Sequence, residues 1–133
     1  MLVIFDCNIW VTLALNGQLD YINDFSKREN VIVSCIELRN ETTSVFYRPK
    51  LNKYISQPDI VKAIELHDLI TTNYKAGKLI RITSDPKDDY LFALSSKSKA
   101  NYLVTGDKLV LNVARYKDTE IITLVRFKEL FNL

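Results

Sequence analysis

The chain has 133 residues, of which 47% are apolar and 26% charged, as is typical of a single soluble globular domain. Its formal net charge of +2 excludes the strongly basic surface of proteins that coat nucleic acid, but it allows a local binding groove. The sequence has no apolar run long enough to span a membrane and no basic start of a secretory signal, so we expect a cytoplasmic protein with no membrane partner.

Apolar runs and turn residues along the chain predict alternating strands and helices. The run 2–5 predicts a strand that is buried on both faces, and Asn8 is expected to cap the next helix. Ser34 is expected to cap a helix that ends near Pro49, and Pro58 suits the first turn of a long helix that Gly77 would terminate. The predicted strands are 2–5, 31–33, 79–82, 102–105 and 120–123; the other predicted helices are 8–15, 19–25, 59–75, 88–98 and 125–131.

This alternation predicts an α/β fold for the whole of residues 1–133, with a central, mostly parallel sheet flanked by helices in one domain. The cysteines, Cys7 and Cys35, are expected to be reduced and buried, because a cytoplasmic chain has no oxidising surroundings. They form no CxxC motif, so a zinc site is not expected.

Acidic residues follow three of the predicted strands, at the edge where open parallel sheets bind ligands. Asp6 directly follows the first strand, Asp88 opens the helix after the third, and Asp107 follows the fourth. Glu41 lies about two turns into the helix after the second strand, from which its side chain can lean back toward the same edge.

Each of these acids except Asp6 has an ordinary structural alternative, as a first-turn, turn or surface residue. Asp6 is harder to explain in this way, because burying a lone carboxylate after an apolar strand is costly. Carboxylates that cluster without a histidine favour a hard cation such as Mg²⁺ or Mn²⁺. His67, the single histidine, is expected in the middle of a helix as a core or surface residue, so a histidine-based triad is not expected.

Four blocks of sequence surround the acids. They are Asp6-Cys7-Asn8, the segment from Ser34 through Glu41 to Arg48-Pro49-Lys50, the run Asp85-Pro86-Lys87-Asp88-Asp89 before an apolar helix, and the run from Ala100 through Val104-Thr105-Gly106-Asp107-Lys108. In these blocks, and over nearly its whole length, the chain resembles the PIN-domain family. The resemblance is strongest to the toxin-type (VapC-like) PIN proteins of prokaryotic toxin–antitoxin systems.

The resemblance implies a Rossmann-like sheet and a ribonuclease that depends on Mg²⁺ or Mn²⁺. It implies catalytic and metal-binding roles for Asp6, Glu41, Asp88 and Asp107, and supporting roles for Asn8, Thr105 and Asp89. A helix cap and a strand-end hydroxyl remain open alternatives for Asn8 and Thr105. The candidate phosphate contacts are Arg48, Lys50, Lys53 and Lys108, although solvated surface charge is the simpler interpretation of each.

One position departs from the family pattern. Many relatives carry a further acid two residues after the aspartate of the last block, and this chain has Leu109 there. The number of metal ions is therefore left open.

The resemblance also implies partners. They are an RNA substrate and a small antitoxin protein, with a homodimer as a further alternative. Ile9, Trp10, Leu13 and Leu19 are candidate anchors for an antitoxin helix, but ordinary core packing is the favoured interpretation of these four.

Other functions fit the residues less well. A haloacid-dehalogenase-type phosphatase needs a second aspartate two residues after Asp6, where this chain has Asn8. A response-regulator receiver domain needs an acidic pair after its first strand and a lysine at the end of its last strand, and the sequence shows neither. A PIN-like nucleic-acid-binding module or a housekeeping nuclease without a toxin role remains the alternative.

Overall fold

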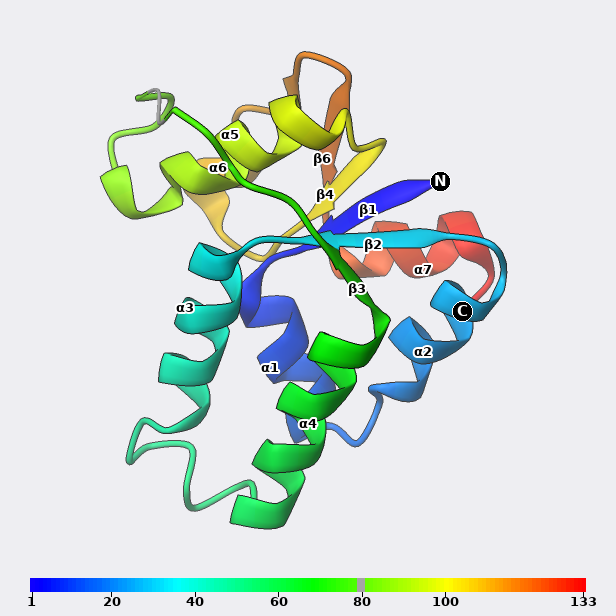
Figure 1. Ribbon diagram of the computed structural model, residues 1–133, viewed down its shortest axis with the longest axis vertical. Coiled ribbons are helices and arrows are strands. Elements are labelled where there is room, and N and C mark those ends of the chain that lie inside the picture. The colour runs from blue at the N-terminus through cyan, green and yellow to red at the C-terminus, as the bar shows by residue number, and fades with distance from the viewer. Residues whose placement is uncertain (79–80) are drawn as a thin grey trace.

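The computed structural model describes residues 1–78 and 81–133 (Figure 1). The elements in chain order are β1 (Leu2–Phe5), α1 (Cys7–Leu15), α2 (Asp20–Lys27), β2 (Val31–Ser34), α3 (Ile36–Phe46), α4 (Gln57–Ile70), β3 (Thr71–Asn73), the short 3₁₀ helix η1 (Pro86–Asp88), α5 (Asp89–Ser98), β4 (Tyr102–Val104), α6 (Lys108–Leu111), β5 (Arg115–Tyr116), β6 (Thr119–Ile122) and α7 (Leu124–Phe131).

The strands of the described residues form one sheet in the order β3-β2-β1-β4-β6-β5. All neighbours are parallel except β5 and β6, which form an antiparallel hairpin. Ile4 pairs with Val33 of β2 on one side and with Leu103 of β4 on the other, and Phe5 pairs with Val104. The carboxyl ends of β1, β2 and β4 therefore meet at one edge of the sheet, and the residues that follow them become neighbours.

One face of the sheet is covered by α1, α2 and α7, which pack around Phe5. The Phe5 ring makes edge contacts with Trp10 of α1, Phe25 of α2 and Phe127 of α7, with ring centroids 6.3, 6.2 and 5.0 Å away. Such aromatic pairs each add about 0.5–1.5 kcal/mol beyond the area that they bury. The end of β1, and with it Asp6, is therefore held in a rigid setting.

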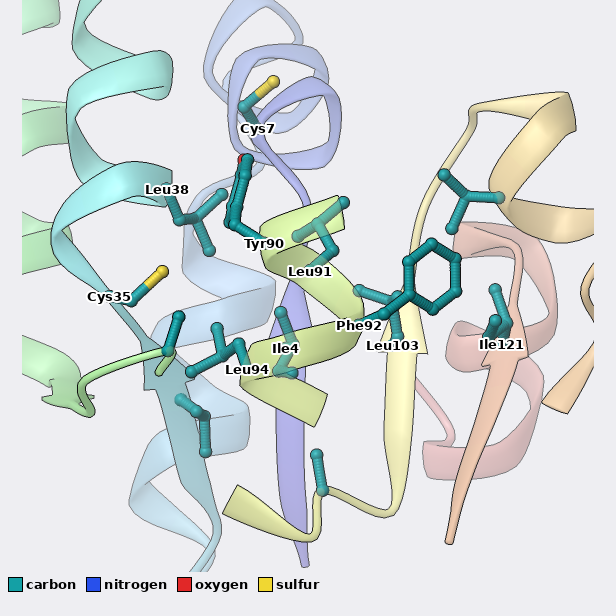
Figure 2. Close-up of a cluster of buried hydrophobic side chains, with 14 residues drawn as sticks. Ile4, Cys7, Cys35, Leu38, Tyr90, Leu91, Phe92, Leu94, Leu103 and Ile121 are labelled. Atoms are coloured by element: carbon teal, nitrogen blue, oxygen red, sulfur yellow. The ribbon is translucent and has the colours of Figure 1, made fainter. Parts of the chain in front are cut away.

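The opposite face is covered by α5, whose apolar residues lie over β1 and β4 (Figure 2). Leu91 and Leu94 are fully buried there with Ile4 and Leu103. Figure 2 also places Tyr90, at the start of α5, beside Leu38 of α3 and below Cys7 of α1.

A third cluster joins α1, α3 and α4, which lie side by side beyond the end of the sheet (Figure 1). Its buried residues are Val11, Phe46, Ile55, Ile60 and Ala63. These contacts fix α3, which carries Glu41, against α1, which begins next to Asp6.

The predicted α/β fold with a mostly parallel central sheet is confirmed. Two predicted helix caps are wrong. Asp6 caps α1 by accepting a hydrogen bond from the Cys7 amide, so Asn8 lies inside the helix. Ser34 is the last residue of β2, and the extended residue before α3 is Cys35.

The predicted helix 59–75 is too long. It ends at Ile70, and β3 (Thr71–Asn73) then pairs with β2. Two consecutive β-branched threonines favour extended backbone, and the Thr71 hydroxyl donates to the His67 carbonyl at the helix end. Gly77, with a φ of +80°, therefore lies in a loop and terminates no helix. Pro58 does lie in the first turn, as expected.

The predicted strand 79–82 is wrong at the two of its residues that the structure describes. Leu79 and Ile80 lie outside the described residues, while Arg81 and Ile82 belong to no strand. The place of that strand in the sheet is taken by β3. The short elements α6 and β5 were not predicted, because four and two residues carry too little periodicity.

Both cysteines are free and buried. Within residues 1–78 and 81–133, no helix combines the length and the apolar character that crossing a membrane requires.

Candidate active site

Asp6 lies where β1 ends and α1 begins, with only 3% of its surface exposed. One carboxylate oxygen, Oδ1, accepts from the Cys7 amide at 2.7 Å. The other, Oδ2, accepts from the Thr105 hydroxyl at 2.7 Å and from the Asn8 side-chain amide at 3.4 Å. These donors are all neutral, so Asp6 is oriented by them without being neutralised.

Asn8 and Thr105 connect Asp6 to the loop after β4. The Thr105 hydroxyl also accepts from the Asp107 backbone amide at 3.1 Å, and the side-chain Oδ1 atom of Asn8 accepts from the Gly106 backbone amide at 3.1 Å. Asp107 turns back to cap α6, accepting from the Leu109 amide at 2.9 Å. Asn8 and Thr105 therefore hold the ends of β1 and β4 together, which is the arrangement expected of supporting residues.

Asp88 lies at the end of η1, directly before α5, and is buried. Its Oδ2 atom is buried without a hydrogen-bond partner. Unsatisfied buried carboxylate oxygens are costly, and they mark places where a ligand or ion can complete the coordination. The two other acids of this segment have ordinary structural partners. Asp85 caps η1 by accepting from the Lys87 amide, and Asp89 accepts from the Ile82 amide at 3.2 Å.

Glu41 approaches the same region from α3. Its Oε2 atom accepts a hydrogen bond from the phenol of Tyr90, the second residue of α5. Burial raises the pKa of the nearby Cys7 thiol, and the charges of Asp6 and Glu41 raise it further. Glu41 and Asp107 also lie near enough to Asp6 for their charges to raise its pKa.

The pKa values of the two buried aspartates are raised. Burial raises the pKa of Asp6 from 3.8 to about 6, against the hydrogen bonds from Thr105 and Cys7, with smaller contributions from Glu41 and Asp107. Burial raises the pKa of Asp88 to about 7, helped by the charges of Asp107, Asp6 and Asp85. Repulsion between carboxylates therefore accumulates in this region, and a cation would relieve it.

The acids do not form a closed ligand set. Among the residues that the structure describes, no three Asp, Glu, His or Cys side chains converge closely enough to hold a metal ion as they stand. The four predicted acids nevertheless lie at one edge of the sheet, linked through their charges and through Thr105 and Tyr90.

Of the predicted phosphate contacts, Arg48 lies near enough to the site for its charge to oppose, in small part, the rise that burial causes in the pKa of the Cys7 thiol. Arg48, Lys50, Lys53 and Lys108 are all exposed, and in the described part of the chain none of them forms an ion pair. Their charges are therefore available to an anionic ligand.

The sequence did not single out Tyr90 or the closeness of Cys7 to Glu41, because a tyrosine in an apolar helix and a cysteine after a strand both look like core residues. It also did not indicate the partners of His67, which is buried. Its Nε2 atom lies 2.9 Å from the Ser34 hydroxyl, and its Nδ1 atom lies 3.1 Å from Asp68. Asp68 in turn pairs with Arg39 of α3, so this network ties α3 to α4.

Three of the four candidate anchors for a partner helix are core residues. Ile9, Trp10 and Leu13 are buried in the cluster around Phe5, while Leu19 is half-buried beside it. The favoured interpretation of the first three as ordinary core residues is confirmed.

A sequence model of the family described as PIN domain matches residues 2–109 of the chain. No curated protein matches it significantly in sequence. Among solved structures, the fold is similar to that of a chain in the crystal structure of VapBC2 from Rickettsia felis bound to a DNA fragment from their promoter, with a TM-score of 0.61 and 15% sequence identity. The similarity covers 92% of this chain and 98% of that chain.

Proposed function

The chain belongs to the PIN-domain family, whose members are nucleases, and on that premise we propose that it is a metal-dependent endoribonuclease. The observation that carries the proposal is the buried pair Asp6 and Asp88. Both have raised pKa values, and Asp88 has an oxygen without a partner. In a purely structural role the buried Asp88 oxygen would have a cationic or hydrogen-bonding partner. Asp6 is held by neutral donors, which leave its negative charge without a cation.

The donors at this edge fit a hard divalent cation, because they are all carboxylate oxygens and repel one another. Asp6, Asp88 and Asp107 would be the principal ligands of Mg²⁺ or Mn²⁺. Glu41 would bind through a water molecule or orient the nucleophile. When bound, the cation would lower the pKa of the attacking water and stabilise the charge that develops on the phosphate and on the leaving 3′-oxygen.

The chain itself supplies positioning. Thr105 and the Cys7 amide fix both oxygens of Asp6, and Thr105 also holds the backbone at Asp107. Asp89 anchors the loop at Ile82 and so steadies the start of α5, next to Asp88. The cluster therefore rests on hydrogen bonds from strand and helix ends, which reduces the reorganisation needed when substrate binds.

The substrate that we propose is RNA, held by its phosphates. Arg48 is the first candidate contact because its charge acts on Cys7 beside Glu41. Lys50 and Lys53 follow it in the exposed segment before α4, and Lys108 follows Asp107. Contacts of this kind give affinity without base specificity, and they weaken as the salt concentration rises.

The proposal is tested by incubating the purified protein with structured and unstructured RNAs in Mn²⁺ or in EDTA. Wild-type protein should cleave in Mn²⁺ alone, and Asp6→Asn and Asp107→Asn should be inactive although folded. Full activity in either variant would reject the site, and undiminished cleavage in EDTA would reject metal dependence.

We further propose that the chain is the toxin of a toxin–antitoxin pair that acts in the cytoplasm. The resemblance to toxin-type PIN proteins and the similarity of fold to VapBC2 support this role. A cluster of carboxylates attracts cationic side chains, and an arginine of a small antitoxin protein could bridge two of them. Such an arginine would occupy the place proposed for the metal.

Expression in a bacterium tests the toxin role. The wild-type chain should arrest growth, Asp6→Asn should relieve the arrest, and the product of a neighbouring reading frame should relieve it and co-purify. Harmless expression of a protein that still cleaves RNA in vitro would instead favour a housekeeping nuclease.

A further inference from the structure

Tyr90 places a hydroxyl group among the acids of the proposed site. Its ring is buried against Leu38 (Figure 2). Its phenol donates a hydrogen bond to Oε2 of Glu41. Tyr90 lies two residues after Asp88, so the junction of η1 and α5 contributes one acid and also holds Glu41, which comes from α3.

Packing alone does not account for this hydroxyl. A phenylalanine would fill the same space in the apolar cluster, and a buried phenol costs free energy unless its polar end finds a partner. The partner here is a half-buried carboxylate of the site, and hydrogen bonds to charged groups are the stronger ones.

We propose that Tyr90 is a positioning residue that fixes the Glu41 carboxylate through Oε2, so that Oε1, which the phenol leaves free, is presented to a divalent cation or to its water. The phenol restricts rotation of the Glu41 carboxylate, whose charge acts on both Asp6 and Cys7. This inference rests on the proposed metal-dependent function and assigns the geometry of one ligand within it.

The test compares Mn²⁺ dissociation constants, measured by isothermal titration calorimetry, of wild-type protein and Tyr90→Phe. The substitution keeps the ring and removes only the hydroxyl. Loss of a hydrogen bond that orients a metal ligand raises the dissociation constant by about 10-fold or more. Tyr102→Phe is the matched control, because Tyr102 is the first residue of β4 and lies at the opposite end of the sheet. This variant should bind Mn²⁺ with the affinity of the wild-type protein.

A double-mutant cycle with Glu41→Gln separates positioning from a general effect on structure. If Tyr90 acts through Glu41, then adding Tyr90→Phe to Glu41→Gln changes the dissociation constant by less than about twofold. The same rise in both backgrounds would overturn the inference, as would wild-type affinity in Tyr90→Phe.

Two further outcomes are distinguishable. Wild-type protein that binds no Mn²⁺ would reject the proposed metal site itself, and with it this inference. If Tyr90→Phe unfolds, Glu41→Asp tests the same link from the other side, because the shorter side chain cannot reach the phenol. Unchanged Mn²⁺ affinity in Glu41→Asp would overturn the inference.

Discussion

Replacing Asp6 by asparagine should stabilise the metal-free protein at neutral pH. Burial raises the pKa of Asp6 from 3.8 to about 6, so the folded state binds this proton more tightly than the unfolded state does. The penalty for ionising Asp6 is therefore absent below about pH 4 and grows until the pH exceeds 6. This rise in the pKa of Asp6 corresponds to about 3 kcal/mol.

The Asp6→Asn variant avoids most of this cost of ionising Asp6 in the folded state. The asparagine side-chain oxygen can still cap α1 at Cys7, but its amide group cannot accept the hydrogen bond from Thr105 or the longer one, at 3.4 Å, from Asn8. That loss costs about 1 kcal/mol, which leaves a gain of about 2 kcal/mol. For a domain of this size the gain corresponds to a rise of about 7 °C in Tm.

Denaturation in EDTA at pH 8 and at pH 4 checks the expectation. Asp6→Asn should be more stable than wild type at pH 8, and the gain should largely disappear at pH 4. Asp24→Asn, which removes an exposed charge from α2, is the matched control and should change little at either pH. A variant that is less stable than wild type at pH 8, or equally stabilised at both pH values, would refute the reasoning.

Three other expectations can be checked with purified variants. Mn²⁺ at a hundredfold excess over its dissociation constant should stabilise the wild-type protein by about 2.7 kcal/mol, and Asp107→Asn should lose most of this in a thermal melt. Arg48→Ala should raise KM for RNA more than Lys53→Ala, because the charge of Arg48 acts on Cys7 in the site; equal effects would contradict that placement. Trp10→Ala should destabilise the protein by about 3–5 kcal/mol in urea melts, and a loss below 1 kcal/mol would mean that its packing around Phe5 contributes little.

The order of strands and helices could be predicted where runs of apolar residues are long. The strand 2–5 and the helix from about 88 to 98 could be predicted from buried apolar runs and from the acidic residues at the start of that helix. The start of β3 could not be predicted, because Thr71 continues a helical pattern and adopts extended backbone only where β2 offers a pairing edge. Tertiary pairing decided that boundary.

The candidate acids were predicted from their positions at strand ends and from the family resemblance. Their roles in the local structure were less predictable. Asp6 serves as a helix cap as well as a candidate ligand, and Asn8 supports the loop at Gly106. The contact between Tyr90 and Glu41 joins residues far apart in the sequence, and no local pattern marks such a pair.

The most direct test of the central claim is the chemistry of the RNA ends after cleavage in Mn²⁺. Attack by a water molecule with the 3′-oxygen as leaving group yields products with a 5′-phosphate and a 3′-hydroxyl. We expect these ends from wild-type protein and no cleavage from Asp107→Asn in the same buffer. Ends with a 2′,3′-cyclic phosphate and a 5′-hydroxyl, formed equally well in EDTA, would contradict a metal-dependent nuclease site at this edge of the sheet.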